Sequence, residues 1–195
     1  MAIDVTLIKQ LREMTGAGIA DVKEALEATK NDIEKAKDWL RKKGQKSASK
    51  KADRSMNEGL IGSYVHSNGK IGVLVEVTCE TDFVARTEDF QALVHDIALQ
   101  IAASNPEYVK PEDVPAEIVA KEKAIYEEEM AKEKKPAAIK EKIIAGKLEK
   151  YYSSACLLKQ PFIKDDKKTI QDRVTETITK TGENIQIKRF IRFAM

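Results

Sequence analysis

The residues best suited to metal or redox chemistry are few and far apart. The chain contains two histidines, His66 and His95, and two cysteines, Cys79 and Cys156. None of them forms the short paired spacings from which zinc sites are built. The two cysteines lack a C-x-x-C motif and fit packing thiols in a reducing compartment better than a disulfide. We therefore expect neither a metal site nor a disulfide framework.

Two further patterns that could carry chemistry lack their essential partners. Ser153 and Ser154 have no histidine near them in the sequence, and no G-x-S-x-G motif occurs. The segment 15–18, TGAG, precedes a helical pattern as a phosphate-binding loop would, but no strand leads into it and no Gly-Lys-Ser or Gly-Lys-Thr follows. A tight turn between helices accounts for it better. We expect that the protein is not an enzyme and uses no cofactor.

One segment carries polar and apolar residues in an order that packing alone does not explain. After an apolar run that ends at Cys79, the chain continues with Glu80, Thr81, Asp82, Phe83 and Val84. The alternation of a strand breaks at this point. Phe83 is either a plug at the end of the core or an exposed apolar tip beside the Asp82 carboxylate, which is the composition of a binding hot spot. These residues alone favour neither reading.

The composition excludes several classes of protein. Of 195 residues, 42% are hydrophobic, which is enough for a core, and 34% are charged, against about 25% in an average globular domain. A net charge of +2 creates no overall field that would attract nucleic acid or an anionic membrane. The apolar stretch Ile71–Cys79 is far shorter than the roughly 20 residues that span a bilayer, and the N-terminus resembles no secretion or transit signal. We expect a cytoplasmic protein that requires neither a membrane nor nucleic acid.

Three short helices are predicted N-terminal to Gly44. Apolar residues recur at helical spacing in each, and Asp4 and Asp32 are suited to cap the first and the third. The basic run 41–54, RKKGQKSASKKADR, is then either a mobile linker or a solvated continuation of the third helix. Residues 1–54 form the first predicted unit.

Residues 55–115 are predicted to form the first part of an antiparallel-sheet core. Two apolar, β-branched runs at 60–66 and 71–79 flank Asn68-Gly69, a dipeptide typical of a type I′ hairpin turn. A helix with one apolar face follows Thr87 and should cover the hairpin. A proline-rich loop ends this part of the chain.

Residues 116–152 are predicted to form a helical hairpin. Many Lys and Glu residues surround a narrow apolar stripe, and Pro136 stands where the second helix would begin. Because the stripe is too narrow to be buried all round, the hairpin should protrude as a coiled coil. Residues 153–195 then return to the core with a short helix that Gly182 stops and a closing strand. The predicted fold class is α+β.

Four segments together resemble a known family. LREMTGAGIADVKEAL near the N-terminus and TDFVAR after the predicted strand are similar to the signature segments of elongation factor Ts, the guanine-nucleotide exchange factor of elongation factor Tu. LLKQPFIKD and GENIQIKRF resemble later motifs of that family, so the resemblance covers nearly the whole chain. Two features depart from the usual pattern: Thr78 replaces an Asn, and the sequence ends at Met195 where many members continue. Longer members carry a doubled core, so this chain resembles the short form.

The resemblance implies both a fold and a mechanism. Residues 1–54 would form a ubiquitin-associated-like domain that docks on the nucleotide-binding domain of elongation factor Tu, in its GDP-bound and nucleotide-free forms. A loop would insert beside the Mg²⁺ and phosphate site of that domain, with residues Thr81, Asp82, Phe83 and Val84. Phe83 would be the apolar wedge and Asp82 the polar group that repositions nearby elements, while Val84 supports them and Thr81 caps the loop. A homodimer is also expected, since one small core sheet leaves an exposed face or edge.

Two readings from other functional classes stay open on the sequence alone. The basic run 41–54 suggests an RNA-binding protein whose affinity would depend steeply on salt, although no aromatic residue is interleaved for base stacking. The N-terminal helices alone suggest an adaptor for a ubiquitin-like partner, which would bind without changing nucleotide release. A nucleotide-release assay separates both from an exchange factor.

Overall fold

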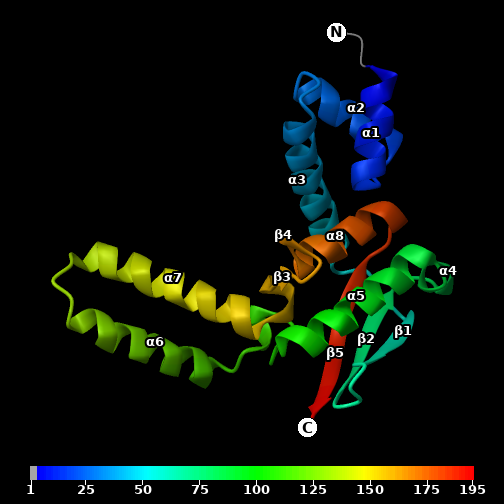
Figure 1. Ribbon diagram of the computed structural model, residues 1–195. Helices are drawn as coiled ribbons and strands as arrows, with labels where there is room; N and C mark the ends of the chain where they lie inside the picture. The colour runs from blue at the N-terminus through cyan, green and yellow to red at the C-terminus, as the bar shows by residue number, and fades with distance from the viewer. Residues whose placement is uncertain (1–3) are drawn as a thin grey trace.

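The chain begins with a three-helix bundle in the computed structural model, which describes residues 4–195 (Figure 1). Its helices are α1 (Val5–Thr15), α2 (Ile19–Ala28) and α3 (Ile33–Lys51). As predicted, the carboxylates of Asp4 and Asp32 cap α1 and α3 by accepting backbone N–H groups of the first turn. The bundle has its own small apolar core, whose buried members are Leu11, Ala17, Val22, Ala25, Leu26, Ala36 and Leu40.

The third helix is longer than the sequence predicts. Gly44 does not end it, and α3 continues through the basic run to Lys51. The reason is tertiary, because Gly44 is buried where α3 crosses α8 (Ile170–Thr181). A Cβ at Gly44 would lie 2.9 Å from Oγ1 of Thr179, so glycine permits the close approach of the two helices. The basic run is therefore helical as far as Lys51 and packed on the core along one face, and it is not a mobile linker.

A three-stranded antiparallel sheet forms the base of the core. Its strands are β1 (Glu58–Val65), β2 (Ile71–Cys79) and β5 (Ile185–Ala194), in the order β1-β2-β5. Leu74 in the central strand pairs with Ser63 on one side and with Ile191 on the other. The C-terminal strand thus lies beside a strand more than a hundred positions earlier, and the predicted α+β class is confirmed.

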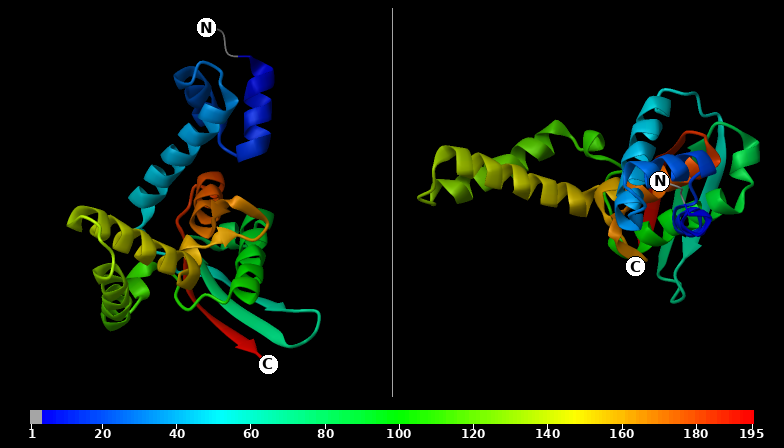
Figure 2. Two further views of the ribbon diagram at one scale, coloured as in Figure 1. Left: turned by 60° about the vertical axis from the view of Figure 1, so that its left-hand side comes forward. Right: turned by 90° about the horizontal axis from the view of Figure 1, so that it is seen from above.

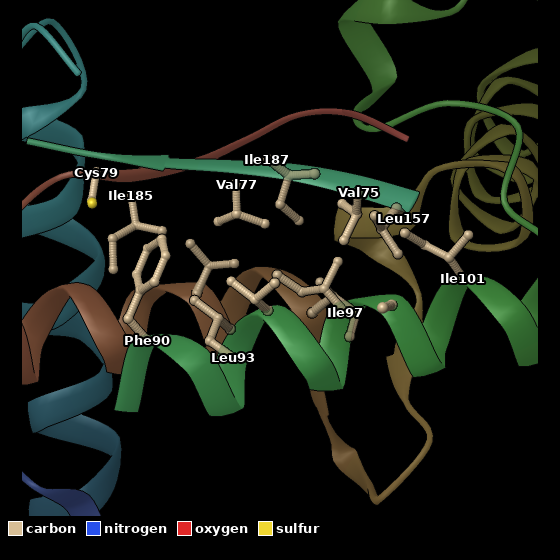
Figure 3. Close-up of a cluster of buried hydrophobic side chains, with 14 of the residues drawn as sticks. Val75, Val77, Cys79, Phe90, Leu93, Ile97, Ile101, Leu157, Ile185 and Ile187 are labelled. Carbon is tan, nitrogen blue, oxygen red and sulfur yellow. The ribbon is translucent and has the colours of Figure 1, made fainter. Parts of the chain in front are cut away.

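One face of the sheet is covered by helix α5 (Glu88–Ser104), as predicted, and α8 packs beside α5. Figure 3 shows Val77 pointing from the sheet toward Leu93 on α5, and Val75 toward Ile97 on the same helix. These side chains are almost completely buried, so this layer is the main hydrophobic core of the protein. The short helix α4 (Asp82–Ala85) links β2 to α5 at one end of the layer.

The turn between β1 and β2 differs from the predicted type I′ turn. Gly69 has a φ of 67°, whereas Asn68 is outside the left-handed region that a type I′ turn requires at both positions. His66 pairs with Ile71 through its backbone N–H, and the N–H of Gly69 donates to the carbonyl of His66 at 2.8 Å. Because four residues and not two connect His66 to Ile71, one left-handed residue is enough to close the loop.

Helices α6 (Ala116–Ala131) and α7 (Ala137–Ala155) form a hairpin that leaves the side of the core (Figures 1 and 2). Two short 3₁₀ helices, Pro111–Asp113 and Leu157–Lys159, precede and follow it. A small antiparallel pair, β3 (Pro161–Phe162) and β4 (Asp165–Thr169), then leads into α8. The sequence did not indicate this pair, because the charged run of β4 has no apolar alternation. Within residues 4–195, no helix is long and apolar enough to cross a membrane.

Candidate partner-binding site

The segment singled out by the sequence forms a single helical turn at one end of the core. Helix α4 contains four residues, and Thr81 precedes it in an extended conformation with a φ of −130°. The Thr81 hydroxyl oxygen accepts the backbone N–H of Val84 at 3.4 Å, which makes Thr81 the N-cap residue. Thr87 caps α5 in the same way immediately afterwards. Two caps in succession hold α4 at a sharp corner between β2 and α5.

Phe83 lies on the outside of this corner. Its side chain is 78% exposed, whereas the neighbouring Val84 is only 9% exposed and belongs to the main core. The reading of Phe83 as a core plug is therefore wrong, since Val84 and Ala85 fill that place. An aromatic side chain with this exposure adds little to the stability of the fold and is available to a partner.

Asp82 is the first residue of α4 and also lies at the surface. Its carboxylate contacts the guanidinium of Arg86 with Oδ2 and Nη2 2.8 Å apart, one turn along the chain. The Arg86 side chain is largely exposed and that of Asp82 is about half exposed, so water screens the pair and a partner can replace it at little cost. The outer surface of α4, here called the α4 tip and defined by Asp82 and Phe83, thus presents a carboxylate beside an aromatic ring.

A residue that the sequence analysis did not assign supports this tip. Both carboxylate oxygens of Glu183, in the corner between α8 and β5, face the start of α4. They accept the backbone N–H groups of Glu80 at 3.1 Å and Thr81 at 3.0 Å, and the Thr81 hydroxyl at 2.7 Å. The only signal in the sequence was the motif GENIQIKRF, which contains Glu183 but does not say what it contacts.

Two more contacts tie the same segment to its surroundings. The Glu80 carboxylate accepts the backbone N–H of Asn184 at 2.6 Å and lies 3.3 Å from the Arg54 guanidinium. The Asn184 N–H lowers the pKa of Glu80, and Arg54 adds to this effect. Under the loop, the Cys79 thiol donates to the carbonyl of Thr81 at 3.2 Å. Burial, together with the negative charge of Glu183, raises the pKa of Cys79.

The N-terminal bundle is fixed to the core through α3 and α8. The buried Asp172 carboxylate accepts hydrogen bonds from Nε of Arg41 at 3.1 Å and from Nε2 of Gln45 at 3.3 Å, across this interface. Burial by itself raises the pKa of Asp172, but hydrogen bonds from Thr169 and the Arg41 charge outweigh it, so the net shift of this pKa is downward. Lys51 at the end of α3 donates to the carbonyl of Gly182 at 2.7 Å.

A shallow groove between α1 and α2 is the second surface feature of interest. Its floor includes Val5, Ile8 and Ile19, and basic side chains stand along it: Lys9, Arg12 and Lys23. Val5 and Ile19 are exposed although they are aliphatic. Figure 1 and the right-hand view of Figure 2 place α1 and α4 on the side of the molecule that faces away from the α6–α7 hairpin. One partner can therefore reach both features from that side.

The outer face of the sheet is the third such surface, here called the outer sheet face. Side chains on this face alternate with those that enter the core, and among residues 4–195 none covers its apolar members: Ile61, Val65, Leu74, Ile191 and Phe193. Leu74 and Ile191 are direct cross-strand neighbours at its centre. Exposed apolar side chains gathered on one sheet face, here beside the ion pair of Glu76 and Arg189, are typical of an interaction surface.

The other residues considered in the sequence have ordinary structural surroundings. Cys156 is buried, which raises its pKa to about 11. The hydroxyls of Ser153 and Ser154 donate to backbone carbonyls of α7. The rings of His66 and His95 lie near the Tyr64 ring, with centroids 6.2 and 6.1 Å away. Within the described part of the chain, no group of three His, Cys, Asp or Glu residues is placed to hold a metal ion.

Comparison with known proteins identifies the family of this chain. The family described as Elongation factor TS matches residues 5–195. A protein named Elongation factor Ts from Anaeromyxobacter sp. (strain Fw109-5) is 54% identical over 99% of this chain and 88% of its own length. Proteins of the same name from Moorella thermoacetica and Coprothermobacter proteolyticus are 55% and 54% identical, over 95% and 100% of this chain and 92% and 99% of their own lengths. The chain therefore belongs to the elongation factor Ts family.

Proposed function

We propose that this protein binds elongation factor Tu in the cytoplasm and accelerates the release of its GDP during translation elongation, by inserting the α4 tip beside the Mg²⁺ and phosphate site. Membership of the elongation factor Ts family supports the partner and the reaction. The observation that carries the role of the tip is the 78% exposure of Phe83 on a turn that caps and buried neighbours hold in place.

The proposed mechanism relies on how a nucleoside diphosphate is held. Mg²⁺ and the backbone N–H groups of a phosphate loop bind it together, so a small displacement of that region weakens several interactions at once. Thr81 and Val84 anchor the turn, and Phe83 enters the partner as an apolar wedge. The Asp82 carboxylate leaves Arg86 and contacts polar groups of the partner instead. Burying one Phe side chain contributes about 1.5 to 3 kcal/mol, which corresponds to about 10- to 100-fold in a rate constant. A larger acceleration requires further contacts.

The N-terminal bundle supplies those contacts in our proposal. The groove between α1 and α2 combines exposed aliphatic side chains with a mainly basic border, in which Glu13 is the one acidic residue that lines it. It docks on the nucleotide-binding domain of elongation factor Tu as a ubiquitin-associated-like domain would. Binding energy gained there is independent of nucleotide, and the α4 tip converts part of it into weaker nucleotide binding. By linkage, nucleotide weakens the binding of the factor by the same ratio. The factor therefore accelerates exchange in both directions and does not select GTP over GDP.

The outer sheet face is proposed to bind a second copy of the chain. Its apolar side chains lie on one face of an antiparallel sheet, which is self-complementary when two sheets pack face to face about a two-fold axis. The face does not include the α4 tip or the bundle groove. Dimerisation therefore leaves each protomer its own set of contacts with elongation factor Tu.

RNA binding through the basic run is the weaker alternative. Several of its cations are already engaged within the protein: Arg41 with Asp172, Lys43 with Asp21, Lys51 with Gly182 and Arg54 with Glu80. A run that neutralises its own acidic neighbours retains less charge for phosphate contacts.

Release of a fluorescent GDP from elongation factor Tu, measured with and without this protein, tests the proposal. We expect acceleration of at least about tenfold at saturating factor, with turnover at substoichiometric amounts. Binding that leaves the release rate unchanged would favour an adaptor, and salt-sensitive binding to RNA without any effect on release would favour the RNA-binding alternative. Either result would refute the exchange function.

A further inference from the structure

We propose that Glu183 is a positioning residue for nucleotide exchange, which holds the α4 tip in its active shape from the corner between α8 and β5. This inference rests on the proposed exchange function and adds a residue that never needs to touch the partner. It also explains in physical terms why the motif Gly182-Glu183-Asn184 occurs where the chain leaves α8.

Both oxygens of the Glu183 carboxylate accept hydrogen bonds from the segment that leads into α4. One oxygen accepts the N–H groups of both Glu80 and Thr81, at 3.1 and 3.0 Å, and the other accepts the Thr81 hydroxyl at 2.7 Å. Two successive backbone N–H groups that point at one carboxylate oxygen fix the direction of the chain at the last residues before α4. Hydrogen bonds to an ionised acceptor are also roughly twice as strong as neutral ones.

The contact between the two corners is reciprocal. Glu183 binds the backbone of Glu80, while the Glu80 carboxylate accepts the backbone N–H of Asn184 at 2.6 Å. The two corners, one before α4 and one after α8, therefore hold each other through both side chains. Gly182 makes this possible, because its φ of 79° ends α8 in a left-handed turn that L side chains disfavour.

The Thr81 hydroxyl links Glu183 to the first turn of α4. It donates to Glu183 at 2.7 Å and accepts the N–H of Val84 at 3.4 Å. Glu183 thus orients the hydroxyl so that its lone pair faces the first turn of α4. Through this relay, the carboxylate determines both the start of the helix and the direction in which Phe83 projects.

A rigid tip should affect the exchange rate at saturating factor more than the concentration of factor that gives half-maximal exchange. In the proposed mechanism the bundle provides affinity for the nucleotide-bound partner, and the tip acts only as the site opens. If the tip had to become ordered during that step, the ordering cost would appear in the exchange rate at saturating factor. The concentration for half-maximal exchange would change little. A residue that merely stabilised the fold would alter neither parameter in the folded protein.

The test compares Glu183→Gln with Glu176→Gln in the full-length chain. Gln keeps the shape of Glu183, but its amide group accepts only through the oxygen, whereas both carboxylate oxygens of Glu accept. Glu176 lies on α8, and its carboxylate contacts Lys168 and not the tip. Exchange on elongation factor Tu is measured as a function of factor concentration, and amide hydrogen exchange reports on Glu80 and Thr81 independently of any activity. We expect E183Q to lower the saturating rate about tenfold and to lower protection of these amides by about tenfold. The half-saturating concentration should stay within about twofold, and E176Q should match the wild type.

Each other outcome has a distinct meaning. Unchanged amide protection in E183Q, or lost protection with a normal saturating rate, would overturn the positioning role. If the wild type itself does not accelerate release, the proposed function fails, while the amide measurement still decides whether Glu183 orders the tip. Should E183Q not fold, Glu183→Asp keeps the charge but withdraws the carboxylate by one methylene, and the same measurements apply. Wild-type values in E183D would also refute the inference, because an unpositioned charge would then be sufficient.

Discussion

Phe83 and Val84 are consecutive residues whose side chains point in different directions, with Phe83 78% exposed and Val84 9% exposed. Both belong to the four-residue helix α4, where successive side chains diverge by about 100° around the axis. Val84 enters the core under the corner and Phe83 leaves it. Val84 therefore anchors the turn, whereas Phe83 is available to a partner. Variants of these two residues form a matched set.

Phe83→Ala should slow nucleotide exchange without weakening the fold. No cavity forms when an exposed ring is removed, so the free energy of unfolding should change by less than about 1 kcal/mol. Val84→Ala removes buried methyl groups and should lower it by about 2 kcal/mol. Urea unfolding and GDP release measured on both variants check the contrast. A strongly destabilised F83A that retains full exchange would show that the tip has been assigned to the wrong residue.

Ile19→Asp in the bundle groove should weaken the complex with elongation factor Tu and leave the maximal exchange rate unchanged. Ile19 is half exposed and is the first residue of α2, where an acidic side chain is compatible with the helix dipole. Folding should therefore be unaffected. An aliphatic contact that is buried in the complex would be lost, so affinity should fall by about tenfold or more. Titration of GDP release with factor gives both values. A normal half-saturating concentration would remove the groove from the docking surface.

Asp172→Asn should make the protein less stable at neutral pH and less sensitive to acid. The pKa of Asp172 is lowered in the folded state, so its ionised form stabilises the fold. This contribution is fully present above the unfolded pKa of about 3.9 and is lost as the pH falls through the lower folded value. At pH 7 the variant should lose about 2 kcal/mol, the scale of hydrogen bonds to a charged group. Urea unfolding between pH 3 and pH 7 measures the difference, which should shrink toward the acid end.

A matched control for Asp172 is Asp96→Asn. Asp96 is also buried and paired, with Lys164 and Arg173, but it lies within the core and not between bundle and core. Both variants should be less stable, yet only D172N should speed tryptic cleavage in the basic stretch from Arg41 to Arg54, because only it loosens α3. Equal cleavage of the two variants would argue against Asp172 as the link between bundle and core.

Leu74→Glu should convert the proposed dimer into a monomer. Leu74 lies at the centre of the outer sheet face beside Ile191, and a charge there would be buried without a partner in a sheet-on-sheet dimer. Sedimentation equilibrium well above micromolar concentration should give the dimer mass for the wild type and the monomer mass for L74E. Ile125→Glu, at a similarly exposed position on the α6–α7 hairpin, should remain dimeric. A wild type that is monomeric at every concentration would refute the dimer.

The sequence indicated most elements of the fold because their signals are local. The strand Ile71–Cys79, the helix that starts after Thr87 and the stop at Gly182 were all predicted where the structure has them. Each depends on side-chain periodicity or on one capping residue, and these act within a few positions along the chain. The turn at Asn68-Gly69 was predicted in the right place and with the wrong type, because loop length changed which dihedral angles were needed.

The sequence by itself also determined that residues 80–86 contain the unusual motif, but it left the direction of Phe83 open. Only the tertiary structure decided that direction, since burial of Val84 and Ala85 against the core leaves the ring outside. The tertiary structure also decided the role of Gly44, which the sequence predicted as a helix stop and which packs closely against Thr179 in the fold. The clearest case is Glu183, which lies about a hundred positions from Thr81 along the chain and 2.7 Å from its hydroxyl in space. Contacts of this kind depend on how separate elements meet, and no local pattern encodes them.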